Sequence, residues 1–174
     1  MTNEIIFAVV ILIIILMAAY LLARFRRSLR RAGSQLDKDW SDLEVFIKQR
    51  NDNLPSLIQT CRSYMPKDQA SLHLVAEARS AQQKAGSIEE KTAAAVTITH
   101  ALERLFLDAG QFDGMKNNTT YGKLQNRLLE IEERIAERRE AFNEDVARFN
   151  ARLGRYPGRL FTGKGKLKPR APWM

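Results

Sequence analysis

Residues 5–23 read IIFAVVILIIILMAAYLLA, an apolar run that decides how the rest of the chain is placed. The run contains no charged residue, proline or glycine. At about 1.5 Å of rise per residue, a helix of this length crosses roughly the 30 Å hydrocarbon core of a bilayer. A cleavable signal peptide would carry positive charge before the run, and a buried core helix would need a larger protein around it. We therefore predict a single uncleaved transmembrane helix over residues 5–23.

Basic residues set the predicted orientation of this helix. Five arginines follow the apolar run within residues 24–31, whereas residues 1–4 contain no basic side chain. Because positive residues are retained on the cytoplasmic side of a membrane, residues 1–4 are expected outside and everything after residue 23 in the cytoplasm.

The formal net charge of +8 is concentrated at two ends of the soluble part, residues 24–31 and the tail, 154–174. A nucleic-acid-binding protein would carry its basic face on the folded body, so we predict no nucleic-acid partner. Two basic ends beside an anchor favour contact with the anionic lipids of the inner leaflet. Aromatic residues also prefer that interface. The predicted membrane-interface residues are Arg24, Arg26, Arg27, Arg30, Arg31, Lys164, Lys166, Lys168, Arg170 and Trp173.

Apolar spacings of three and four residues predict four helices after the anchor. The first carries Leu36, Trp40, Leu43 and Ile47 and can continue directly from the anchor. It contains Pro55, which is expected to kink it near residues 51–54. A loop is expected over residues 111–120, and the last helix is expected to end near residue 153. The expected caps are Asp68 for the second helix, Ser87 with Glu90 for the third, which Gly110 ends, and Thr119 or Thr120 for the fourth.

Short links between these helices predict antiparallel neighbours. The expected fold class is all-α: one transmembrane helix followed by an elongated, antiparallel, up-down four-helix cytoplasmic bundle over residues 24–153. The fourth helix would then return the basic tail, residues 154–174, toward the membrane.

Residues that could support chemistry are few and scattered. Cys61 is the single cysteine, and His73 and His100 are the two histidines. No glycine-rich turn or orienting carboxylate pattern accompanies them, and the last helix lacks the Glu-x-x-His pairs of di-metal bundles. We therefore predict no catalytic residue, cofactor, metal or small-molecule substrate. A hydrolase that uses Cys61 or a histidine is the weakest alternative, and Cys61 is expected to be a core residue.

Several stretches together resemble the LemA family of bacterial membrane-anchored proteins. They are residues 39–65, 75–81, 123–158 and 166–173, and the pattern that they share with the family comprises Trp40, Arg50, Leu54, Pro55, Leu57, Glu77, Ala78, Arg79, Asn143, Val146, Phe149, Asn150, Pro157 and Gly158. The resemblance implies an anchored helical bundle in the bacterial inner membrane and no defined reaction. Some members help to build magnetosome membranes, which by analogy suggests a membrane-organising role.

Two functions of different classes remain. The first is a non-enzymatic scaffold that associates with copies of itself or with another membrane protein. The polar breaks Arg50 and Arg138 in the apolar seams would then face partners. The second is an adaptor or regulatory subunit of a membrane enzyme, such as a membrane protease.

Overall fold

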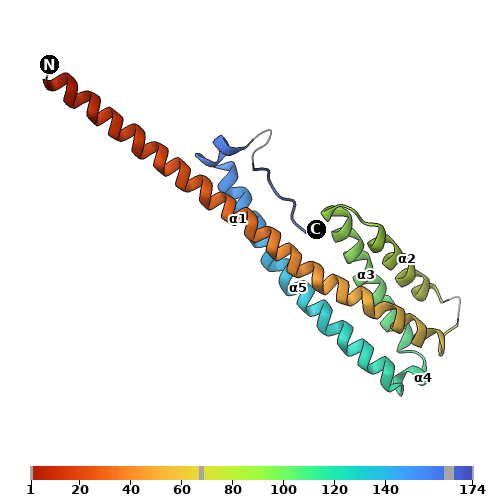
Figure 1. Ribbon diagram of the computed structural model, residues 1–174. Coiled ribbons are helices and arrows are strands. Elements are labelled where there is room, and N and C mark those ends of the chain that lie inside the picture. Colours follow the sequence, from red (N-terminus) through yellow and green to blue (C-terminus); the bar gives the residue numbers. More distant parts are fainter. Residues whose placement is uncertain (1, 67–68, 163–166, 174) are drawn as a thin grey trace. The chain divides into compact units, whose positions relative to one another are not determined.

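The computed structural model describes residues 2–66, 69–162 and 167–173, most of which are helical (Figure 1). Within these ranges the extended pairing is limited to one isolated bridge between Thr162 and Leu167, so the predicted all-α class is confirmed. The elements are α1 (Thr2–Arg62), α2 (Ala70–Lys84), α3 (Ile88–Ala109), α4 (Asp113–Lys116), α5 (Thr119–Gly154) and the short 3₁₀ helix η1 (Gly158–Phe161).

Helix α1 joins the apolar run to the first helix expected after it without a break. It continues through Gly33 and through Pro55, so the expectation that the anchor runs on is confirmed. The kink expected at Pro55 stays a prediction. All large apolar side chains from Ile5 to Leu22 are exposed. By length and composition, this N-terminal part of α1 is compatible with one membrane span.

Local capping signals explain both boundaries of α3. At α3, the Ser87 hydroxyl accepts from the Glu90 N–H, and the Glu90 carboxylate accepts from the Ser87 N–H, which confirms the predicted capping box. Gly110 ends α3 as predicted. Asp68 lies outside the described residues, and α2 begins after Gln69, whose side chain makes no capping hydrogen bond.

The segment expected as a loop at residues 111–120 differs from the prediction in two ways. It contains the one-turn helix α4, and the cap of α5 is Asn118 rather than Thr119 or Thr120. The Asn118 Oδ1 accepts from the Tyr121 N–H at 2.9 Å. An asparagine carbonyl at this position satisfies one of the free N–H groups at a helix start, and sequence alone left three neighbouring polar residues equally able to do so.

The chain divides into two compact units. The first unit comprises Met1–Lys38 and Glu144–Pro172, and the second comprises Asp39–Asn143 and Trp173–Met174. In the second unit, α2 packs along α3 (Figure 1), and the apolar faces of α1, α2, α3 and α5 form one core. Its fully buried members include Leu54, Leu57, Cys61, Val75, Ile98, Leu102, Leu105, Met115 and Leu128.

In the first unit, α1 and α5 bury a smaller apolar set, which comprises Leu29, Leu36, Phe149 and Leu153. Gly33 brings the α1 backbone close to the Phe149 ring, because a Cβ there would lie 3.7 Å from it. The turn after α5 is tighter still. A Cβ at Gly158 would lie 2.1 Å from the Arg152 carbonyl oxygen, a distance that no side-chain carbon can occupy.

Candidate functional site

A buried arginine joins three helices of the second unit. Arg50 on α1 has no exposed surface. Its Nη1 donates to the Glu132 Oε1 on α5 at 2.8 Å and to the Thr99 Oγ1 on α3 at 3.0 Å. Its Nη2 donates to the Ala95 carbonyl oxygen on α3 at 3.1 Å. The Thr99 hydroxyl in turn lies 2.9 Å from the Glu132 Oε2. These contacts tie α1, α3 and α5 together through one side chain.

The chemistry of this cluster requires an arginine. The guanidinium offers five N–H donors in a fixed planar fork, so it can reach a carboxylate, a hydroxyl and a carbonyl together. Glu132 keeps 18% of its side chain exposed, and Arg50 keeps none. The expectation that Arg50 faces a partner protein is therefore wrong. The apolar seam shows that a polar residue interrupts it, but not that acceptors on other helices bind its two terminal nitrogens. The buried Arg50 Nε has no hydrogen-bond acceptor among the described residues. Arg138, the second break, is exposed.

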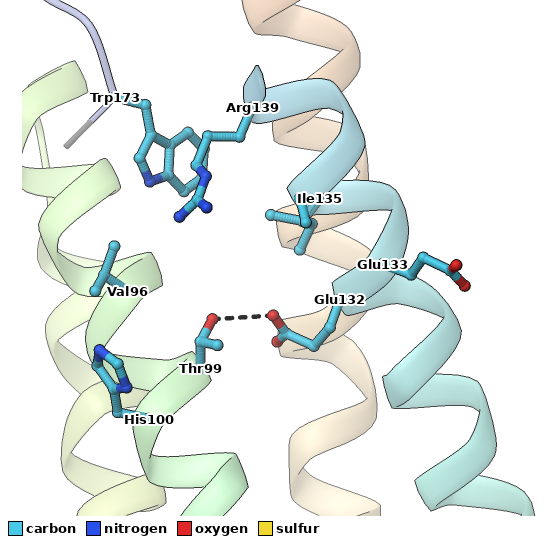
Figure 2. Close-up of a pocket in the computed structure, with 9 residues that line it drawn as sticks. Val96, Thr99, His100, Glu132, Glu133, Ile135, Arg139 and Trp173 are labelled. Carbon is cyan, nitrogen blue, oxygen red and sulfur yellow. Dashed lines mark hydrogen bonds between the residues drawn. The ribbon is translucent and has the colours of Figure 1, made fainter. Parts of the chain in front are cut away.

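A groove opens beside this cluster, between α3 and α5 (Figure 2). It has a volume of about 310 Å³, at the small end of the range for ligand sites. Figure 2 shows the Thr99–Glu132 hydrogen bond across the groove and the Glu133 side chain turned away from it. The lining residues are Val96, Thr99, His100, Glu132, Glu133, Ile135, Ala136, Arg139 and Trp173.

Trp173 closes one end of the groove and is placed differently from its prediction. Only 4% of it is exposed, and its ring lies 6.1 Å from that of Trp40, which in turn lies 5.9 Å from that of Phe142. Trp173 was predicted to sit among lipid headgroups. In the structure it is part of the second unit's aromatic cluster, where its ring packs on Trp40, and this burial removes apolar surface from water.

Two asparagines of α5 hold the tail. The Asn143 side-chain amide donates to the Trp173 carbonyl oxygen at 2.9 Å and accepts from the Trp173 N–H at 2.7 Å. Asn150 makes the same two contacts with Arg170, at 2.8 and 2.9 Å. Seven residues of helix and three residues of extended chain both measure about 10 Å, so one extended tail can satisfy both asparagines. The seven-residue spacing of Asn143 and Asn150 could have indicated this role, but it was not among the signals used for prediction.

The predicted basic interface residues fall into three groups. Arg24, Arg26, Arg27, Arg30 and Arg31 are exposed on α1, and none forms an ion pair with an acidic residue in the described ranges. Lys168 is exposed, whereas Arg170 also pairs with Asp37 at 2.6 Å. Lys164 and Lys166 lie outside the described residues. The first group therefore carries uncompensated positive charge directly after the apolar run.

The candidates for nucleophilic chemistry are not brought into an active arrangement. Cys61 is fully buried in the core as predicted, and its burial raises the thiol pKa to about 11, so the thiol stays protonated at neutral pH. His73 and His100 are both exposed, and His100 contacts Glu103 at 3.4 Å. In the part of the chain that the structure describes, no three metal-ligating side chains cluster.

Comparison with known proteins gives one match. The model of the family described as "LemA family" matches residues 39–173, which include Asp39–Asn143 of the second unit and the tail as far as Trp173. The search of curated proteins found no match.

Proposed function

Because the chain belongs to the LemA family, we propose that it is a non-enzymatic helical scaffold fixed in the bacterial inner membrane. The observation that carries this proposal is the continuity of α1. One helix begins in an exposed apolar segment and ends in the buried core of the second unit. Whatever binds the folded body is therefore tethered to the bilayer through an unbroken helix.

The apolar segment supports the membrane part of the proposal. Soluble proteins rarely expose a contiguous apolar surface beyond a few hundred Å², and every large side chain from Ile5 to Leu22 is exposed. Burial of that surface in lipid is favourable, and the arginines after residue 23 support a proposed orientation with residues 1–4 outside and residues 24–174 in the cytoplasm. The body at 24–153 is proposed as an antiparallel up-down four-helix bundle, since its helix links are short.

The scaffold part rests on surfaces rather than on chemistry. Arg50 is buried and its two terminal nitrogens bind acceptors on α3 and α5, which links α1 to these helices, while the groove between α3 and α5 stays open. We propose that the exposed helix faces bind further copies of the chain within the same membrane. Lys164, Lys166 and Lys168 are proposed to contact anionic headgroups, whereas Arg170 and Trp173 have partners inside the protein.

Oligomeric state in lipid tests the scaffold. The full-length chain is reconstituted in nanodiscs, and its stoichiometry is measured by single-molecule photobleaching at increasing protein-to-disc ratios. We expect dimers or larger assemblies well above the fraction given by random co-occupancy. A monomer at every ratio, with no partner crosslinked in cells, contradicts the scaffold.

A second candidate, an adaptor for a membrane enzyme, is favoured by the groove itself. Arg139 lines the groove and has no ion pair among the described residues, and the buried Trp173 Nε1 has no hydrogen-bond acceptor there. A photo-crosslinker at Val96 reports on what enters the groove, and one at Leu107, an exposed residue of α3 outside it, serves as control. One enzyme captured only from Val96 supports the adaptor, whereas self-crosslinks alone support the scaffold.

A further inference from the structure

A basic hollow lies on α1 in the first unit, directly after the apolar run. Its volume is about 370 Å³, and it is lined by Tyr20, Arg24, Arg27, Ser28 and Arg31. Successive spacings of four, three, one and three residues place all five side chains on one face of the helix. The three guanidinium groups have no acidic partner in the described ranges, so they repel one another until an anion enters.

An apolar hollow adjoins the basic one and shares Arg24 and Ser28 with it. Its volume is about 400 Å³, and its other lining residues are Leu21, Leu22, Phe25 and Pro157. Pro157 comes from the turn after α5, a part of the first unit far from α1 in sequence. One ring contact joins that region to α1, since the Phe25 and Phe161 rings stack at 6.2 Å, and Gly158 packs the turn against the Arg152 carbonyl of α5.

We propose that these two hollows together bind one anionic phospholipid, a function that rests on the proposed membrane anchor. The phosphodiester binds between Arg24, Arg27 and Arg31, where arginine's planar fork matches phosphate oxygens. The Ser28 and Tyr20 hydroxyls donate further hydrogen bonds. The glycerol and the first acyl carbons lie against Leu21, Phe25 and Pro157.

The position of the hollows along α1 favours a lipid over a soluble phosphate. The charged side chains begin at residue 24, where the apolar run ends, which is the depth of the headgroups if the run spans the bilayer. A soluble anion would occupy the basic hollow alone. A lipid is the ligand that presents a phosphate beside hydrocarbon, as the basic and the apolar hollow share Arg24 and Ser28 on the same stretch of α1.

A pair of double variants tests the site without changing net charge between them. Arg27→Gln with Arg31→Gln removes two lining arginines. Arg26→Gln with Arg30→Gln removes two arginines of the same helix, at the same spacing, that do not line either hollow. Each full-length variant is reconstituted in phosphatidylcholine nanodiscs that contain a minor fraction of phosphatidylglycerol. The retained phosphatidylglycerol is then counted by native mass spectrometry after release into mild detergent.

We expect the lining pair to retain about tenfold less phosphatidylglycerol than the control pair, since two charge-assisted contacts are lost. Equal losses in both pairs would mean diffuse attraction between α1 and the leaflet, which overturns the site and leaves the membrane anchor intact. Loss of the retained lipid on addition of inorganic phosphate would assign the hollow to a soluble anion and also overturn it. Failure of the unmodified chain to enter nanodiscs contradicts the anchor itself.

Discussion

Arg50 in the second unit and the five arginines of residues 24–31 in the first unit belong to the same helix, α1, yet their surroundings are opposite. Arg50 is fully buried and donates to three acceptors from two other helices. The five arginines are exposed and have no acidic partner among the described residues. A basic residue on a helix therefore links helices to one another only where other elements bring hydrogen-bond acceptors to it. Elsewhere it stays available for an external anion.

The largest expected effect comes from removing the hydrogen bonds of Arg50. Arg50→Met leaves the Glu132 carboxylate partly buried without its cation, so the free energy of unfolding should fall by about 3 kcal/mol. Urea unfolding of the full-length chain in detergent, followed by circular dichroism, measures it. Arg138→Met, an exposed change of the same type, should stay within about 0.5 kcal/mol. Equal losses of unfolding free energy in the two variants would mean that Arg50 does not link the three helices. Adding Glu132→Met to Arg50→Met should recover most of the loss.

The next effect concerns the turn after α5, which contains Gly158. Gly158→Ala forces a Cβ into the Arg152 carbonyl oxygen, so the turn must shift, at a cost of about 2 kcal/mol. Hydrogen exchange of residues 155–162 measures it, and that segment should exchange faster. At Gly154 a Cβ would meet nothing within 4 Å, so Gly154→Ala is the matched control and should leave exchange unchanged or slower. Equal exchange in the two variants would contradict the close packing of Gly158.

Removing the asparagine that holds Trp173 should have a smaller effect. Asn143→Ala deletes both hydrogen bonds to the Trp173 backbone, which we expect to destabilise the tail by about 1–2 kcal/mol. Faster hydrogen exchange of residues 167–173 would report it. Asn126→Ala, an exposed asparagine of the same helix, is the control. Tail exchange that is insensitive to Asn143 would mean that ring packing alone holds Trp173.

The capping box of α3 joins residues within one helix end and sets the scale for a local contact. Ser87→Ala removes the acceptor for the Glu90 N–H and should lower the free energy of unfolding by about 1 kcal/mol. Urea unfolding measures it, and Ser80→Ala, inside α2, provides a serine change without a cap. A loss of unfolding free energy as large as that of Arg50→Met would remove the distinction between a local cap and a side chain that links three helices.

The smallest effect is a pH dependence. The Gly86 and Ser87 N–H groups donate to Glu90 and lower its pKa below the ordinary 4.5. The ionised carboxylate therefore stabilises the folded state above that value, and this stabilisation is lost as the pH falls through the lower folded-state pKa. The melting temperatures of the unmodified chain and of Glu90→Gln should differ at pH 7 and converge in acid. Glu89→Gln, without such contacts, should show no comparable convergence.

Features with a local cause were predictable from the sequence. The Ser87 box, the Gly110 stop and the buried stripe with Cys61 all follow from residue spacing within one helix, and the structure has each of them. The cap at Asn118 was missed because three adjacent polar residues could each supply it. The family membership was also predictable, since its pattern is spread over residues 39–173.

Most of the candidate site could not be predicted from the sequence, because its contacts join residues that are far apart in the chain. Thr99 and Glu132 lie 49 and 82 residues from Arg50, and no helical period relates them. Trp173 was assigned to the membrane from residue preference alone. That preference is equally met by an aromatic cluster, and the deciding contact is a side-chain amide of Asn143 that binds backbone rather than another side chain.

The burial of Trp173 against Trp40 has a consequence for the order of events during synthesis. Trp40 leaves the ribosome as part of α1, before α2, α3 and α5 are made, and Trp173 follows all of them. Until Trp173 is added, the Trp40 ring and the amide of Asn143 have no cover from the tail. The nascent chain therefore exposes an aromatic surface while the helices are being made, and the aromatic cluster can close only once Trp173 has been synthesised.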